Sequence, residues 1–190
     1  MGALVNNLLD MARIESGQVK LRKQWHAIEE VVGSALLAAK AALGRRHVEV
    51  RVPSDLPLVE FDATLIERVL YNLVENAAKY TPADATIAIS AEVAGRDLVV
   101  RVSDTGPGIP KGQEEAIFEK FSRGVSESTT PGVGLGLAIS RAIVEAHRGR
   151  ISAANAPSSG AIFTFTLPLG SPPEVPDEAP TTAVARSEAE

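Results

Sequence analysis

The residues best suited to chemistry lie along one face of a helix predicted over residues 64–79. Asn72, Asn76 and Lys79 occupy positions i, i+4 and i+7, so their side chains point the same way. An amide oxygen is a hard ligand for Mg2+, and a lysine ammonium pairs with phosphate. A solvated helix face is the alternative interpretation of this segment alone, but two amides and a lysine in line favour a site for a magnesium-bound phosphate.

A carboxylate stands at the end of the second strand of a predicted hairpin. Asp104 follows a valine-rich run, and Gly106 and Gly108 come directly after it. Glycines allow the backbone to approach a flat ligand, and a carboxylate there can accept a hydrogen bond from an exocyclic amine such as that of adenine. A simple Asp-Thr-Gly turn is the alternative interpretation.

Three further glycines, Gly132, Gly134 and Gly136, precede a run with helical periodicity. A glycine-rich loop at a helix N-terminus presents free N–H groups and the positive end of the helix dipole to phosphate. The segment is not a Rossmann fingerprint, because the residues before it are polar and loop-like. It is not a P-loop either, since no Gly-Lys-Ser/Thr follows.

The elements that must position these residues form a two-layer pattern. Asp62 is the predicted N-cap of the central helix, and Pro82 ends it. Residues 105–133 form a long irregular stretch, which we expect to be a mobile lid over a nucleotide. The other helices are predicted over residues 1–16, 27–43 and 136–148, and the strands over 19–25, 47–52, 58–60, 86–93, 98–103, 150–154 and 162–167. The sum is an α/β fold, a two-layer α/β sandwich with a mixed sheet backed by three helices.

Four segments in this order resemble the N, G1, F and G2 boxes of the ATP-binding domain of sensor histidine kinases. They span residues 72–81, 104–109, 118–123 and 132–137, and residues 160–166 are similar to a further box. The domain belongs to the Bergerat (GHKL) superfamily, with gyrase B, the MutL repair proteins and the ninety-kilodalton heat-shock chaperones. Within it, residues 21–36 look most like the potassium-responsive Kdp sensor kinases.

The resemblance implies ATP and Mg2+ as cofactors, and a role for each matching residue. Asn76 would coordinate Mg2+, Tyr80 would pack on adenine, and Asp104 would accept from the adenine amino group. Gly106 and Gly108 would shape the adenine site, and Thr164 would line its base. Three residues would carry the catalytic contacts with the phosphates: Asn72, Lys79 and Arg123. The remaining nucleotide-binding positions would be Ile109, Phe121, Gly132, Gly134, Leu135, Gly136 and Leu137.

Two departures bear on the reaction. In the hydrolysing members of the superfamily a glutamate general base lies four residues before the magnesium asparagine, where this chain has Asn72, and a neutral amide cannot take a proton from water at pH 7. His26, His47 and His147 all lie outside a phosphoacceptor motif, so we expect structural or surface roles for them and an acceptor histidine on a domain absent from this chain.

Composition agrees with a single soluble cytoplasmic domain. The chain has 190 residues, no cysteine and a net charge of −5, which excludes thiol chemistry and argues against nucleic acid as a partner. Residues 1–18 resemble the C-terminal end of a dimerisation helix in which the chain begins partway, residues 19–169 are the expected ATP-binding kinase domain, and 170–190 are an acidic, proline-rich tail expected to be disordered.

The resemblance implies that the full-length protein is a homodimer in the inner or plasma membrane, attached only through domains missing here. Its partners would be its own dimerisation domain and a response regulator receiver domain. Two alternatives stay open: an ATP hydrolase of the same superfamily, with Glu75 or Glu67 as base, and a non-enzymatic ATP-sensing docking module.

Overall fold

The computed structural model describes residues 21–120 and 134–170. Three predicted segments lie wholly or partly outside these residues: the helix over 1–16, residues 121–133 of the predicted lid, and the acidic tail from 171. In chain order, the helices are α2 (Ile28–Ala38), α3 (Lys40–Leu43), α4 (Ala63–Tyr80), the 3-10 turn η1 (Ala116–Phe118) and α5 (Gly136–Ala146). The strands are β1 (Gln24–His26), β2 (His47–Arg51), β3 (Val59–Phe61), β4 (Thr86–Ala94), β5 (Asp97–Asp104), β6 (Ile151–Asn155) and β7 (Ala161–Pro168).

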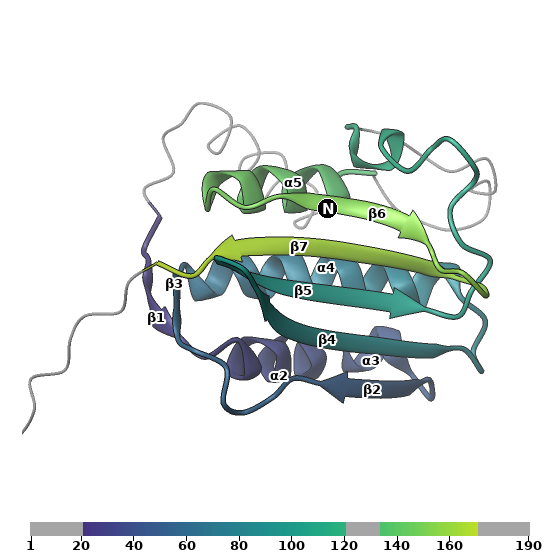
Figure 1. Cartoon of the computed structure of the whole chain (residues 1–190). Coiled ribbons are helices and arrows are strands. Elements are labelled where there is room, and N and C mark those ends of the chain that lie inside the picture. Colours follow the sequence, from purple (N-terminus) through teal and green to yellow (C-terminus); the bar gives the residue numbers. More distant parts are fainter. Residues whose placement is uncertain (1–20, 121–133, 171–190) are drawn as a thin grey trace, which may run out of the picture.

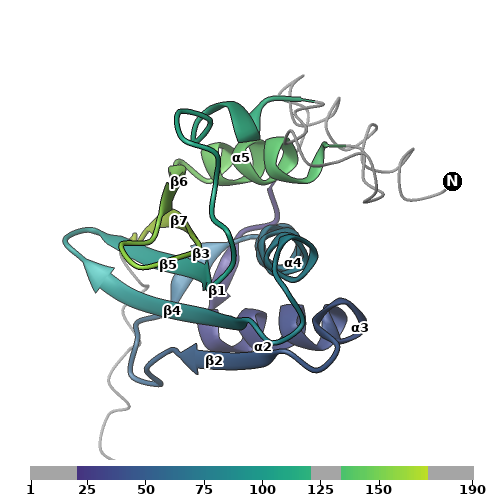
Figure 2. The ribbon, with the colours of Figure 1, turned by 90° about the vertical axis from the view of Figure 1, so that its right-hand side faces the viewer.

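The main sheet has five strands in the order β2-β4-β5-β7-β6. Strand β2 runs parallel to β4, and the other neighbouring pairs are antiparallel, so the sheet is mixed as predicted. Seen along the layers, α5, α4 and α2 with α3 stack on one face of the sheet (Figure 2). The prediction of a two-layer α/β sandwich backed by three helices is confirmed.

The core lies between the sheet and the helices, and strand alternation builds it. Strand β7 alternates buried and partly buried residues, with Phe163, Phe165 and Leu167 pointing into the core. Helix α4 crosses the middle of the sheet (Figure 1) and buries one continuous face that includes Ile66, Leu70 and Leu73. Because α4 is held along this whole face, its opposite stripe has a fixed direction.

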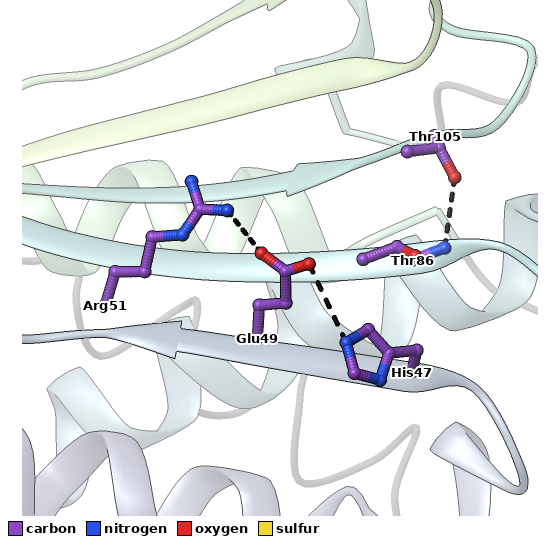
Figure 3. A network of polar contacts seen from close by, with 5 residues as sticks. All are labelled: His47, Glu49, Arg51, Thr86 and Thr105. Atoms are coloured by element: carbon purple, nitrogen blue, oxygen red, sulfur yellow. Dashed lines mark hydrogen bonds and ion pairs between the residues drawn. The ribbon is translucent and has the colours of Figure 1, made fainter.

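The outer face of β2 carries charged side chains. On β2, Glu49 lies between His47 and Arg51; it makes an ion pair with Arg51, and its other oxygen lies near the His47 ring (Figure 3). The His47 Nε2 to Glu49 Oε1 distance is 3.7 Å, and both partners of Glu49 are largely exposed. These charges on an edge strand discourage pairing with another chain. The strand predicted over residues 47–52 is confirmed as β2, which begins at His47, where the chain pairs in parallel with Thr86.

Several predicted boundaries differ from the structure. The helix predicted over 27–43 is divided at Ala39, where ψ is 0°; Ala39 and Leu43 are both buried, so the bend keeps the short second segment on the core. Within the described part of the strand predicted over 19–25, only Gln24 and Trp25 belong to a strand, β1, which extends to His26 and pairs with the three residues of β3. This small β1-β3 sheet was not predicted as a separate unit. Helix α5 ends two residues early, since Arg148 adopts a positive φ of 63°.

Among the described residues, no helix is both long enough and apolar enough to cross a membrane.

Candidate nucleotide-binding site

The amide stripe of α4 faces the beginning of α5. Asn72 donates from Nδ2 to the Gly136 carbonyl oxygen at 3.1 Å and to Ser140 Oγ at 3.2 Å. Ser140 is fully buried and donates in turn to the same Gly136 carbonyl at 2.9 Å. Asn72 therefore ties the middle of the predicted magnesium helix to the first turn of the helix that follows the glycines. Helical spacing placed Asn72 on the polar stripe of α4, but it did not indicate this hydrogen bond to a residue 64 positions away.

The first turn of α5 has no side-chain cap at its N-terminus. Leu135 occupies the cap position and is 2% exposed, and a leucine side chain offers no acceptor to the first N–H groups of the helix. Gly134, just before it, has a φ of +68°, a conformation that glycine adopts without strain. Helix N-termini of this kind attract anions through their N–H groups and dipole. Leu137, a predicted binding residue, is partly buried against the core.

One and two turns beyond Asn72 stand the other polar residues of the stripe. Asn76 is half-buried, and within the described residues its side chain makes no hydrogen bond. Lys79 donates from Nζ to the Tyr80 hydroxyl at 2.9 Å, and its ammonium lies 4.7 Å from the centre of the Tyr80 ring. Tyr80 keeps 42% of its surface exposed. A cation, an exposed ring and an amide oxygen therefore follow one another along the end of α4.

Asp104 ends β5 as a buried carboxylate, 8% exposed. Its Oδ1 accepts from the backbone N–H of Gly106 at 2.9 Å and from that of Ala161 at 3.3 Å. Within the described residues Oδ2 accepts no hydrogen bond, so it is the oxygen left for a donor of a ligand. The strand end is also fixed from the other side, because the Thr86 N–H donates to Thr105 Oγ1 at 3.0 Å (Figure 3).

The two glycines after Asp104 stand where side chains would collide. A Cβ on Gly106 would come within 2.6 Å of the Thr81 methyl carbon, and Thr81 itself is 7% exposed. Gly108 has a φ of +79° and its Cβ would come within 2.5 Å of Asn155 Oδ1. The predicted need for glycine at both positions thus has a steric cause. Thr81 directly follows α4, so the carboxylate segment packs on the end of the same helix whose middle contacts Gly136.

Three groups around this segment were missed by sequence reasoning. Arg46 donates to the Thr81 carbonyl at 2.8 Å and to Thr81 Oγ1 at 3.3 Å, while also bonding the Ala42 and Leu43 carbonyls at the end of α3. Asn155 pairs with the backbone of Ile109. Ser159 donates to the Gly106 carbonyl at 2.7 Å. No local pattern marks these residues, because each acts on a segment at least 35 residues away.

The structure contradicts the expected position of Thr164 at the base of the adenine site. Phe163 and Phe165 point into the core, so Thr164 between them must point to the opposite face of the sheet, where it pairs with Arg101. Asp104 lies on the core-facing side with Leu98, Val100 and Val102. Thr164 therefore does not line the site. The β7 residue beside Asp104 is Ala161, through its backbone N–H.

Phe121, Arg123 and Gly132 lie outside the described residues. The described part of the predicted lid runs to Lys120 and includes η1, where Phe118 is buried and meets Phe163 edge to face at 6.3 Å between ring centres. Arg141 of α5 covers the other side of the Phe118 ring at 4.4 Å and bonds Glu115 at 2.7 Å. This stretch of the segment is thus packed on α5.

Among the described residues, neither a carboxylate base nor a metal cluster accompanies Asn72. Glu75 is exposed and accepts a hydrogen bond from the Tyr71 hydroxyl at 2.9 Å, which raises the pKa of Tyr71; burial and the Glu75 charge act in the same direction. In the described parts of the chain, no group of three His, Cys, Asp or Glu residues could hold a metal ion. The donor set still fits Mg2+, which is commonly held by one or two protein oxygens together with substrate phosphates and water.

The histidines have structural or surface positions, as predicted. His26 stacks against Phe61 with ring centres 5.4 Å apart, and His47 is exposed. His147 is 3% exposed and joins α5 to α4: its Nδ1 donates to the Ile143 carbonyl at 2.8 Å, and its Nε2 accepts from the Asp62 N–H at 3.0 Å. Burial lowers the pKa of His147 below 6.5, the Ile143 bond opposes this, Lys23 lowers it further and Asp62 raises it.

Residues 61–171 match the family described as histidine kinase-, DNA gyrase B- and HSP90-like ATPase. The chain belongs to this family. It is 54% identical over 172 residues to the sensor protein KdpD of Escherichia coli K12, a match that covers 90% of this chain and 19% of KdpD. This chain therefore spans about a fifth of the length of that relative.

Solved histidine kinases share the fold. The full-length ShkA structure in complex with AMPPNP superposes with a TM-score of 0.78 at 28% identity, covering 90% of this chain and 36% of ShkA. ThkA in complex with the response regulator TrrA gives a TM-score of 0.70 at 25% identity, covering 89% of this chain and 49% of that one. The chain thus carries the ATP-binding catalytic domain of the histidine kinase type, and its similarity to KdpD agrees with the expected Kdp resemblance.

Proposed function

We propose that this domain binds Mg-ATP along helix α4 and donates the terminal phosphoryl group to a histidine on a dimerisation domain outside this chain. One observation carries the proposal. Helix α4 contacts the first turn of α5 through Asn72. Thr81, the residue directly after α4, lies against Gly106 in the segment that follows Asp104. The two contacts are nine positions apart in sequence, about 13.5 Å at 1.5 Å per residue, which suits an extended nucleoside triphosphate.

Along this length, different residues would bind the base, the Mg2+ ion and the phosphates. Asp104 Oδ2 would accept from the adenine amino group, while Oδ1 stays engaged by two backbone N–H groups. The exposed Tyr80 ring would cover the base. Asn76 would hold Mg2+ through its amide oxygen, and bound Mg2+ would neutralise phosphate charge. The first turn of α5 and Lys79 would supply the remaining positive field.

The surroundings of Asn72 favour transfer over hydrolysis. Its neutral amide cannot take a proton from water, and its nitrogen is already engaged by Gly136 and Ser140. Phosphoryl transfer depends mainly on positioning and charge neutralisation, which this site offers without a base of its own. The hydrolase alternative predicts steady-state phosphate release that disappears in Glu75→Gln. Our proposal predicts negligible release before and after the substitution.

The proposed partners follow the relatives. ThkA is solved with a response regulator, and KdpD is named a sensor protein. We infer a homodimeric, potassium-responsive sensor kinase in which this cytoplasmic domain phosphorylates its own dimerisation domain and so feeds a response regulator, with the membrane reached through other domains.

Two measurements test the proposal. In calorimetry with Mg-ATP or Mg-ADP, Asp104→Asn should weaken binding about 10- to 150-fold, the worth of one hydrogen bond to a charged group. Unchanged affinity would refute the placement of adenine. Mixing the chain with a separately expressed dimerisation domain and γ-labelled ATP should label the acceptor histidine. Nucleotide binding without any label would leave only the docking module.

A further inference from the structure

The side chain of Asn155 holds the backbone of the segment that follows Asp104. Its Oδ1 accepts from the Ile109 N–H at 2.6 Å, and its Nδ2 donates to the Ile109 carbonyl at 2.8 Å. An asparagine amide used in this way copies the pairing of a neighbouring strand. Asn155 is the last residue of β6 and lies 46 positions away in sequence, so the link is purely tertiary.

Three strands align this link with the carboxylate. Asn155 pairs with Ala161 across β6 and β7, and the Ala161 N–H reaches Asp104 Oδ1 on β5. Asp104, Ala161 and Asn155 thus lie side by side on three neighbouring strands. The loop from Asp104 to Ile109 begins at the first of them and is hydrogen-bonded to the last. Ser159 fastens its middle through the Gly106 carbonyl.

The local backbone is shaped for this contact. Gly108 has the positive φ that turns the loop toward β6, and any Cβ there would occupy the space of Asn155 Oδ1. Gly160, at a φ of +96°, lets the β6–β7 turn approach so closely that a Cβ would overlap the Asp104 carbonyl oxygen. Gly108 in the loop and Gly160 in the β6–β7 turn therefore allow the loop and the turn to pack closely against each other.

We propose that Asn155 is a positioning residue for the nucleotide base, and that it sets the preference for adenine over guanine. This inference rests on the proposed function. Adenine offers an amino donor where guanine offers a carbonyl acceptor, so discrimination depends on a correctly aimed acceptor at Asp104. Asn155 does not touch the carboxylate. It removes the freedom of the loop whose Gly106 N–H orients that carboxylate.

The test compares Asn155→Ala with Ser152→Ala, a matched control on the same strand whose side chain is exposed and which pairs with Thr164 of β7. Dissociation constants for Mg-ATP and Mg-GTP are measured by calorimetry on the full chain. Asn155→Ala should lower the GTP-to-ATP ratio of dissociation constants about three- to tenfold, the range for weakening one hydrogen bond. Ser152→Ala should keep the ratio of the unmodified protein.

A second variant and a second readout keep the test decisive. Asn155→Asp retains an acceptor for the Ile109 N–H but loses the donor to its carbonyl, so its ratio should be intermediate. Hydrogen exchange of the Ile109 amide should accelerate in Asn155→Ala before any nucleotide is added. Equal weakening of ATP and GTP, or an unchanged Ile109 exchange rate, would overturn the positioning role. Absence of Mg-ATP binding in both the unmodified protein and Ser152→Ala would instead refute the proposed function, and this inference with it.

Discussion

We expect His147 to make the stability of this domain sensitive to acid. Its ring is buried at the junction of α5 and α4, donating through Nδ1 and accepting through Nε2. Only the neutral ring can accept the Asp62 N–H, since a proton on Nε2 would set one donor against another. His147→Ala leaves that N–H without its partner and removes a buried ring. We expect a loss of about 2–4 kcal/mol in the free energy of unfolding.

The pH dependence follows from the direction of the shift. The folded-state pKa of His147 lies below the ordinary 6.5, chiefly because of burial. Between that lowered pKa and about 6.5, the unfolded chain binds more protons than the folded one, so the contribution of His147 is complete above about pH 6.5 and is lost as the pH falls. The slope from this one group cannot exceed about 1.4 kcal/mol per pH unit.

Urea unfolding followed by fluorescence of Trp25, the only tryptophan in the chain, measures this from pH 5.5 to 7.5. The stability difference between the unmodified protein and His147→Ala should be largest above pH 6.5 and shrink toward pH 5.5. His47→Ala is the matched control, because that ring is exposed; it should cost less than about 0.5 kcal/mol at every pH. A difference for His147→Ala that stays constant with pH would refute the assigned hydrogen bonds.

Three other substitutions test the supports of the site. Gly160→Ala puts a Cβ into the Asp104 carbonyl at a positive φ, so we expect a loss of at least about 1–3 kcal/mol in stability by urea unfolding, together with weaker nucleotide binding. Asn72→Asp replaces the donor to the Gly136 carbonyl with a carboxylate; calorimetry should show Mg-ATP affinity reduced about tenfold or more, and unaltered affinity would contradict the proposed phosphate end. Arg46→Ala removes both ties to the residue after α4, and thermal unfolding should show a loss of about 1–3 kcal/mol; an unchanged midpoint would count against a supporting role.

Much of the fold could be predicted because its signals are local. The helical spacing of Ile66, Val69, Leu70 and Leu73 and the N-cap Asp62 marked α4 almost to the residue. The hairpin of β4 and β5 was also expected, since two strand-like runs flank a short turn at Gly95. The boundaries failed where pairing partners set them. Strand β1 pairs over three residues with the three residues of β3, and the sequence just before Gln24 does not indicate where this pairing begins.

Sequence alone determined which chemical groups this domain has for a nucleotide: two asparagines and a lysine on one helical face, a carboxylate followed by glycines, and glycines before a second helix. Periodicity and turn chemistry carry that information, since both act over a few residues. Tertiary structure decided what those groups can reach. It turned Thr164 to the far face of the sheet, joined Asn72 to Gly136 and fastened Ile109 to Asn155. Contacts across tens of residues depend on how sheet and helices pack as layers, and a short stretch of sequence does not contain its distant partner.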